Sequence, residues 1–178
     1  MNLPNKLTML RVILVPVFMV FAAYSRYGTA DFNPTFALIA GIIFAVASFT
    51  DFLDGYLARK NNLVTDFGKF MDPLADKMLV MAAMCYFVEC GQMPGWCLAI
   101  VLLREFAVSG MRLVAVAQGR VIAAAWSGKV KTASTMVCLC LMLVFESNLL
   151  NIVCITVIVA TTVYSGIEYF AKNLDVFK

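Results

Sequence analysis

Long apolar segments separated by short polar ones run through the whole chain. A helix crosses the hydrocarbon core of a membrane in about 20 residues, so six such segments nearly exhaust the sequence. The expected spans are 12–24, 35–58, 71–89 (with a start near 68 also compatible), 96–117, 130–145 and 149–170. The pattern predicts an all-α, polytopic membrane protein with six transmembrane helices in a single domain, residues 1–178.

The first eleven residues mix apolar and polar side chains, unlike the uniformly apolar spans. Leu3, Leu7 and Leu10 stand among polar residues, which is typical of a short amphipathic segment lying at the membrane interface before the first span. Lys6 and Arg11 ahead of an apolar run are also typical of a signal peptide. Because five further apolar segments follow, a retained first helix is favoured.

The composition supports a membrane protein. Of the 178 residues, 62% are hydrophobic and 14% charged, whereas a soluble domain carries about a quarter charged residues. The mean hydropathy is +0.88, and we expect no separate soluble domain. The chain has no histidine, so carboxylates or lysines must carry out any proton transfer.

Basic residues predict the orientation of the spans. With the N-terminus inside, twelve of the fourteen lysines and arginines are cytoplasmic, Arg26 is outside and Arg104 lies within a span. Cytoplasmic loops carry an excess of Lys and Arg, so we expect both termini in the cytosol.

One polar stretch, residues 51–77, stands out from this apolar background. It holds two pairs of aspartates at helical spacing, Asp51 with Asp54 and Asp72 with Asp76. Each pair lies on one face of its helix, and the predicted orientation places both at the cytoplasmic end. Asp72 before Pro73 is also compatible with a simple helix cap. Four clustered carboxylates instead favour a pair of divalent cations, Mg²⁺ or Mn²⁺, of the kind that clamps phosphate oxygens.

A second set of charged residues lies on the fourth and fifth spans. Glu105 is expected to pair with basic residues there, in a polar cavity suited to a phosphate-bearing substrate. The alternative is that Arg112, Lys129 and Lys131 are ordinary cytoplasmic anchors of their helices. The candidate phosphate-binding residues are Arg104, Arg112, Lys129 and Lys131.

The aspartate stretch resembles the signature of the CDP-alcohol phosphotransferases. The pattern D-x2-D-G-x2-A-R-x8-G-x3-D-x3-D matches Asp51 through Asp76 without departure, and the six-span topology extends the resemblance over the whole chain. Softer motifs are similar to the bacterial phosphatidylglycerophosphate synthase branch of the family. They are NLPNKLTMLR at 2–11, TDFGKFMDPLADK at 65–77, REFAVSGMR at 104–112, GKVKT at 128–132 and SGIEYF at 165–170.

The resemblance implies an enzyme that transfers the phosphatidyl group of CDP-diacylglycerol to sn-glycerol 3-phosphate and releases CMP. Two Mg²⁺ or Mn²⁺ would be held by the four aspartates, and Asp76 would be the general base. The implied setting is the bacterial cytoplasmic (inner) membrane, with the site on the cytoplasmic side, a homodimer and no nucleic-acid partner. The implied CDP-diacylglycerol pocket comprises Gly55, Ala58, Arg59, Thr65, Asp66 and Gly68, and the mouth Asn5, Thr8 and Arg11.

Two alternatives stay open at this stage. The acceptor could be another alcohol, such as inositol phosphate, serine or a lipid-free alcohol, because basic residues do not separate one phosphorylated acceptor from another. The chain could instead be a divalent-cation or proton-coupled transporter. All four aspartates are expected at one end of the bundle, and the other half of the bundle has no matching acidic residues to continue an ion path, which argues against transport.

Overall fold

A computed structural model describes most of the chain. The backbone is described for residues 3–25, 33–60, 66–120, 122–123, 125–145 and 147–177. Within these ranges, the side chains of residues 3–6, 51–60, 66–70, 72–73, 76 and 177 are outside the description.

The described residues form long helices joined by short connections. Their bounds are α1 Leu3–Tyr24, α2 Pro34–Lys60, α3 Asp66–Glu89, α4 Gly95–Ala117, α5 Trp126–Val144 and α6 Asn148–Asn173, followed by the 3₁₀ helix η1 Leu174–Phe177. The all-α prediction is confirmed, and the start of α3 falls at the earlier of the two expected positions. The N-terminal segment is continuous with the first helix and does not form a separate element.

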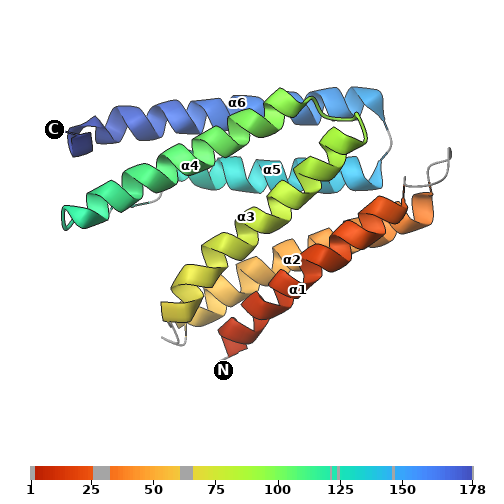
Figure 1. Ribbon diagram of the computed structural model, residues 1–178, viewed down its shortest axis with the longest axis horizontal. Coiled ribbons are helices and arrows are strands. Elements are labelled where there is room, and N and C mark those ends of the chain that lie inside the picture. Colours follow the sequence, from red (N-terminus) through yellow and green to blue (C-terminus); the bar gives the residue numbers. More distant parts are fainter. Residues whose placement is uncertain are drawn as a thin grey trace.

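The helices alternate in direction, so that the start of α1 and the end of α6 lie at the same end of the bundle (Figure 1). α1 packs along α2 and α3, while α6 packs along α5 and α4. α3 also contacts α4 and α5, and α2 contacts α5, which joins the two groups. α3 therefore links the helix bearing the first aspartate pair to the helices bearing the predicted phosphate-binding residues.

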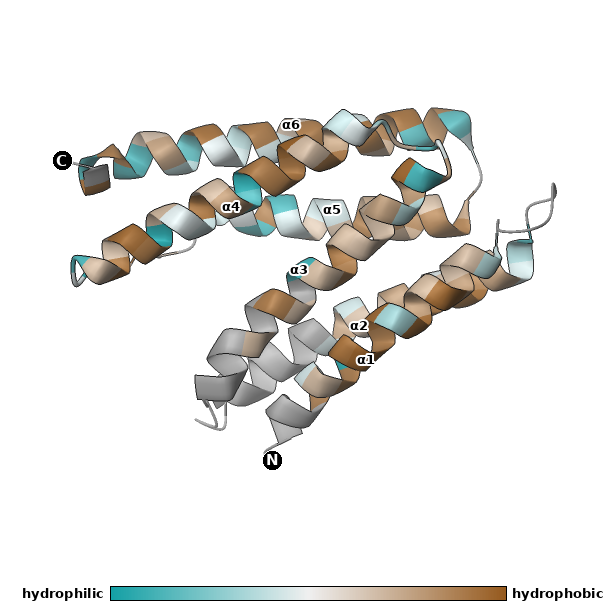
Figure 2. Ribbon diagram, in the orientation of Figure 1, coloured by the Kyte–Doolittle hydropathy of each residue, from teal (hydrophilic) through white to brown (hydrophobic). Residues whose placement is uncertain are grey.

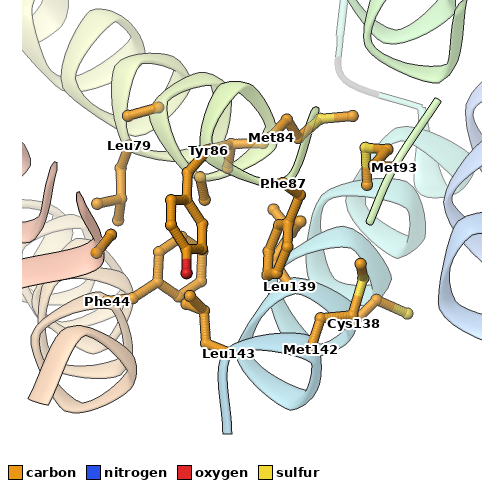
Figure 3. Packing of buried hydrophobic residues seen from close by; sticks show 14 of the residues in the cluster. Phe44, Leu79, Met84, Tyr86, Phe87, Met93, Cys138, Leu139, Met142 and Leu143 are labelled. Atoms are coloured by element: carbon orange, nitrogen blue, oxygen red, sulfur yellow. The ribbon is translucent and has the colours of Figure 1, made fainter. Parts of the chain in front are cut away.

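The core lies where these two groups meet (Figure 3). Phe44 of α2, Phe87 of α3 and Leu139 of α5 are almost completely buried in one apolar cluster. At Gly41 an added Cβ would lie 3.1 Å from Cγ2 of Val144, so the glycine permits α2 to approach α5 closely. Lipid is as apolar as such side chains, so close packing, more than exclusion from water, holds these helices together.

Hydrophobic residues are frequent along the helices (Figure 2), and many large apolar side chains are exposed. Leu103, Phe106 and Leu113 of α4 are each 72% exposed, which a membrane environment explains. Three helices within the described residues are long and apolar enough to cross a membrane, in the ranges Leu7–Tyr24, Trp126–Val144 and Asn148–Val176. A shorter apolar helical stretch is Pro34–Thr50. The protein is therefore a helical membrane protein, and within the described residues three of the six expected spans, the first, fifth and sixth, correspond to candidate membrane-crossing helices.

Candidate functional site

The aspartates are carried by two consecutive helices. Asp51 and Asp54 lie toward the end of α2, and Asp72 and Asp76 lie in the first turns of α3. Because only residues 61–65 connect these helices, their aspartate-bearing ends are at the same end of the bundle (Figure 1). The placement on two helix ends is confirmed, whereas the four carboxyl groups lie outside the described side chains.

The expected CDP-diacylglycerol residues follow the same two helices. Gly55, Ala58 and Arg59 belong to α2, and Asp66 and Gly68 belong to the start of α3. Thr65 lies outside the described residues, as do the side chains of the other members of this set.

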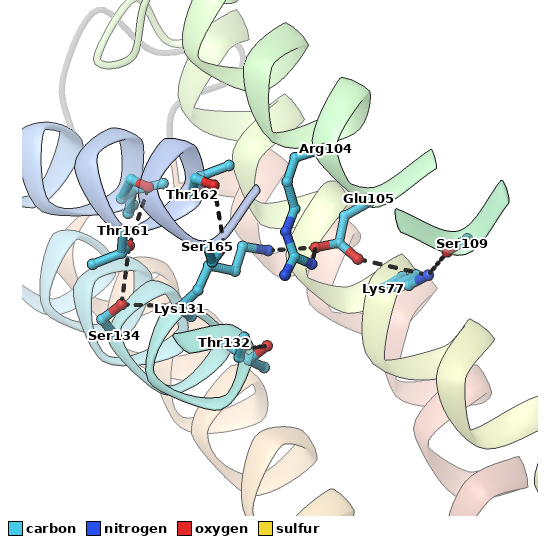
Figure 4. Close-up of polar contacts among 12 residues, drawn as sticks. Lys77, Arg104, Glu105, Ser109, Lys131, Thr132, Ser134, Thr161, Thr162 and Ser165 are labelled. Carbon is cyan, nitrogen blue, oxygen red and sulfur yellow. Dashed lines mark hydrogen bonds and ion pairs between the residues drawn. The ribbon is translucent and has the colours of Figure 1, made fainter. Parts of the chain in front are cut away.

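The described part of the site is a charged cluster centred on Glu105 (Figure 4). The ammonium group of Lys131 donates a hydrogen bond to Oε1 of Glu105 at 2.8 Å, and Nη1 of Arg104 donates to the same oxygen at 2.9 Å. The Lys77 ammonium lies 3.6 Å from Oε2 and donates to the hydroxyl of Ser109 at 2.8 Å. The cluster thus joins α3, α4 and α5, and the predicted pairing of Glu105 with basic residues is confirmed.

Two glycines make room for the buried guanidinium of this cluster. A Cβ at Gly128 of α5 would lie 3.3 Å from Nη2 of Arg104, and one at Gly166 of α6 would lie 3.4 Å from its Cγ. The side chain of Arg104 is only 13% exposed. The sequence places Arg104 inside a predicted span, and the structure shows it packed between α5 and α6.

The cluster carries more positive than negative charge. Lys77, Arg104 and Lys131 surround one carboxylate, which leaves a net charge of +2 among these four residues. Burial weakens the screening of such charges by water, so their attraction for an anion exceeds that of surface lysines. A small cavity of about 20 Å³, lined in part by Lys77, Glu105 and Lys131, adjoins the cluster.

The other two predicted phosphate-binding residues lie elsewhere. Arg112 is exposed on α4, where its Nε donates to the Tyr169 hydroxyl at 3.1 Å and its guanidinium carbon lies 5.6 Å from the ring centre. The exposed Lys129 has its ammonium 5.9 Å from the centre of the Trp126 ring. The structure therefore brings Arg104 and Lys131 together and places Arg112 and Lys129 outside their hydrogen-bonded cluster.

The expected mouth residues lie on α1. Thr8 and Arg11 are almost completely buried, at 1% and 0% exposure, so this part of α1 faces protein. The side chain of Asn5 is outside the described residues.

Lys77 is the residue of the cluster that the sequence-based prediction missed. The spacing along α3 offers Lys77 no ion-pair partner, and its positive charge alone predicts only a cytoplasmic position. The available signal was its position directly after Asp76, in a polar stretch already singled out.

Comparison with known proteins decides the family. Residues 1–164 match the model of the CDP-alcohol phosphatidyltransferase family. The chain belongs to this family. The CDP-alcohol phosphatidyltransferases generally use divalent metals, in agreement with the oxygen-rich donor set on α2 and α3.

Bacterial relatives align with nearly the whole chain. A CDP-diacylglycerol–glycerol-3-phosphate 3-phosphatidyltransferase of Bacillus subtilis (strain 168) is 44% identical, with 99% of this chain and 97% of the relative covered. A protein of Haemophilus influenzae with the same name is 38% identical over 94% of this chain and 91% of its own. A probable phosphatidylglycerophosphate synthase of Mycobacterium tuberculosis (strain CDC 1551 / Oshkosh) is 37% identical over 97% of this chain and 82% of its own.

Proposed function

We propose that this chain is a CDP-diacylglycerol–glycerol-3-phosphate 3-phosphatidyltransferase. The observation that carries the proposal is the 44% identity to the Bacillus subtilis relative of that name over 99% of this chain. The aspartate signature, which matches at every fixed position, and the surplus of positive charge around Glu105 support the proposal. The products are phosphatidylglycerophosphate and CMP.

Asp51, Asp54, Asp72 and Asp76 are the residues that would hold two divalent cations, Mg²⁺ or Mn²⁺. The donor set fits, because these ions prefer carboxylate oxygens and the chain has no histidine to favour a softer metal. When bound, the ions supply charge stabilisation to the pyrophosphate of CDP-diacylglycerol.

The reaction proceeds by proton abstraction and displacement at phosphorus. The carboxylate of Asp76 takes the proton of the 1-hydroxyl of sn-glycerol 3-phosphate. The deprotonated oxygen attacks the phosphorus on the diacylglycerol side of the pyrophosphate. A new P–O bond forms to this oxygen as the bond between the same phosphorus and the bridging oxygen breaks. The electron pair of that bond leaves with CMP, and the proton stays on Asp76 until water removes it.

The remaining residues bind the two substrates. Gly55, Ala58, Arg59, Thr65, Asp66 and Gly68 form the CDP-diacylglycerol pocket, where small residues let the nucleotide approach the helix backbone. The acceptor phosphate binds at the charged cluster through Arg104 and Lys131, with Arg112 and Lys129 as outer contacts. Asn5, Thr8 and Arg11 close the mouth from α1, a role that fits the almost complete burial of Thr8 and Arg11.

The proposed setting is the bacterial inner membrane. All six helices cross it, both termini and the site face the cytoplasm, and the chain is a single domain that forms a homodimer. α4 is as apolar on average as the other helices and differs from a simple span by its three charged residues, Arg104, Glu105 and Arg112, of which the first two are only 13% exposed and turned toward other helices. Inward-facing charges of this kind are compatible with a membrane-spanning helix.

An acceptor panel tests the proposal. The purified protein in detergent is incubated with CDP-diacylglycerol and either glycerol 3-phosphate, inositol phosphate or serine, with and without a chelator, and CMP release is measured. We expect metal-dependent release with glycerol 3-phosphate. Release only with inositol phosphate or serine would overturn the assignment of the acceptor, and metal flux into proteoliposomes without CMP release would overturn the enzyme assignment.

A further inference from the structure

The three cations around Glu105 are held unequally. Lys131 and Arg104, with side chains 5% and 13% exposed, both donate to Oε1 within 2.9 Å. Lys77 is 39% exposed and lies 3.6 Å from Oε2, beyond ordinary hydrogen-bond distance. Its ammonium group donates a hydrogen bond to the neutral hydroxyl of Ser109 at 2.8 Å.

This inequality separates two roles within the cluster. Arg104 and Lys131 each donate one hydrogen bond to the Glu105 carboxylate and keep further N–H groups for the phosphate. Lys77 can in addition give up its weak contact without leaving a buried carboxylate unpaired. The adjoining cavity, at about 20 Å³, has room for about one water molecule and is too small for a phosphate. An incoming phosphate therefore meets the cluster on its exposed side, where Lys77 lies.

The position of Lys77 along α3 fits the same role. It directly follows Asp76, the proposed general base, and is therefore only about 1.5 Å further along the helix axis. The attacking hydroxyl and the phosphate of the acceptor are joined by three carbons, so both must bind within a short distance of each other. A cation at this level of α3 meets that requirement along the axis, and the turn of about 100° between consecutive helix residues places it to one side of the base, where a three-carbon acceptor can bridge the two.

We infer that Lys77 is a further binding residue for the acceptor phosphate, and that Glu105 is a positioning residue that holds the cations of the cluster in place. The inference rests on the proposed function and deepens it. Glu105 does not touch the substrate in this scheme. Its carboxylate keeps Arg104 and Lys131 beside Lys77, and so maintains a positive site without binding the anion itself.

The test uses the purified full-length protein and measures CMP release at varied concentrations of each substrate. For Lys77→Gln we expect the KM for glycerol 3-phosphate to rise about tenfold, because a charge-assisted hydrogen bond is lost. The kcat and the KM for CDP-diacylglycerol should change less than about twofold. The inhibition constant of inorganic phosphate, competing with glycerol 3-phosphate, should rise in parallel, and Lys77→Arg should restore most of the affinity.

Glu105→Gln should raise the same KM and the same phosphate inhibition constant, and Glu105→Asp should recover part of the loss because the charge is retained. Glu168→Gln and Lys172→Gln are the matched controls, since these residues form a separate ion pair on α6. Both controls should leave all three constants within about twofold of the unsubstituted protein.

The outcomes separate this inference from the proposed function. If the unsubstituted protein releases no CMP with glycerol 3-phosphate, the proposed function fails first. If it is active but Lys77→Gln leaves the acceptor KM and phosphate inhibition unchanged, Lys77 is not a phosphate contact. If Glu105→Gln lowers kcat and thermal stability without moving either constant, or fails to fold while Glu105→Asp is indistinguishable from the unsubstituted protein, its role is structural and the positioning role is refuted.

Discussion

Lys131→Met removes the most deeply buried cation of the charged cluster while keeping an unbranched side chain of similar length. The Lys131 side chain is 5% exposed, and its ammonium donates to Glu105 at 2.8 Å. After the substitution Glu105 keeps Arg104 at 2.9 Å and Lys77 at 3.6 Å, so no buried carboxylate is left unpaired. The net charge of the four residues falls from +2 to +1.

These contacts set the expected magnitudes. Loss of one charged hydrogen bond costs about 1.5–3 kcal/mol, but apolar replacement within a buried ionic group recovers part of that cost. We therefore expect unfolding to become easier by about 1–2 kcal/mol. For the acceptor, the loss of one positive charge should weaken binding by about 1.4 kcal/mol, which raises the KM about tenfold.

The assay is CMP release from CDP-diacylglycerol in detergent micelles, with a thermal melt of the same sample. Lys129→Met is the informative comparison, because the same substitution two residues earlier removes an exposed ammonium near Trp126. Its effect on the acceptor KM should be smaller than that of Lys131→Met. If Lys131→Met lowers the melting temperature but leaves this KM within about twofold, the cluster does not bind the acceptor phosphate.

Three further predictions test other parts of the site. Asp51→Asn or Asp72→Asn should abolish CMP release with the melting temperature nearly unchanged, because each would remove a shared metal ligand; near-normal activity would refute the metal site. Arg112→Ala should raise the KM for glycerol 3-phosphate more than the KM for CDP-diacylglycerol, and the reverse order would assign Arg112 to the nucleotide. Gly128→Ala places a methyl group 3.3 Å from Nη2 of Arg104, so the guanidinium must shift by a few tenths of an ångström. We expect the acceptor KM to rise about threefold with little loss of stability, and an unchanged KM would show that the exact place of this guanidinium is unimportant.

The helices could be predicted because lipid and helix geometry act on each segment separately. Each apolar run has to satisfy its own backbone hydrogen bonds, so the bounds of the apolar segments agree with those of the helices α2 through α6 within a few residues. The N-terminal segment was harder, because its mixture of Leu3, Leu7 and polar residues does not reveal that Thr8 and Arg11 face protein. That burial depends on the packing of α1 against α2 and α3, which no local pattern contains.

The charged site is a clearer example of contacts that local sequence patterns do not predict. Glu105 and Arg112 share a helical face, but seven residues separate them by about 10 Å along the axis, too far for an ion pair. The actual partners of Glu105 come from α3 and α5 and from its own neighbour Arg104, whose flexible side chain reaches back to it. Spacing along one helix predicts what shares a face, whereas the crossing of α3, α4 and α5 decides which charges meet.

The net charge of the cluster connects this packing to the chemistry. Three cations around one carboxylate are unfavourable in a membrane protein, because each buried charge loses hydration and like charges repel. Gly128 and Gly166 leave the space that lets Arg104 join the cluster despite this cost. A phosphate monoester carries close to two negative charges at neutral pH, so its binding beside Lys77 would bring the sum near zero. The attraction for the acceptor and the repulsion among the three cations then have one origin. Added phosphate should therefore raise the melting temperature of the protein, and substitutions that raise the acceptor KM should reduce this stabilisation.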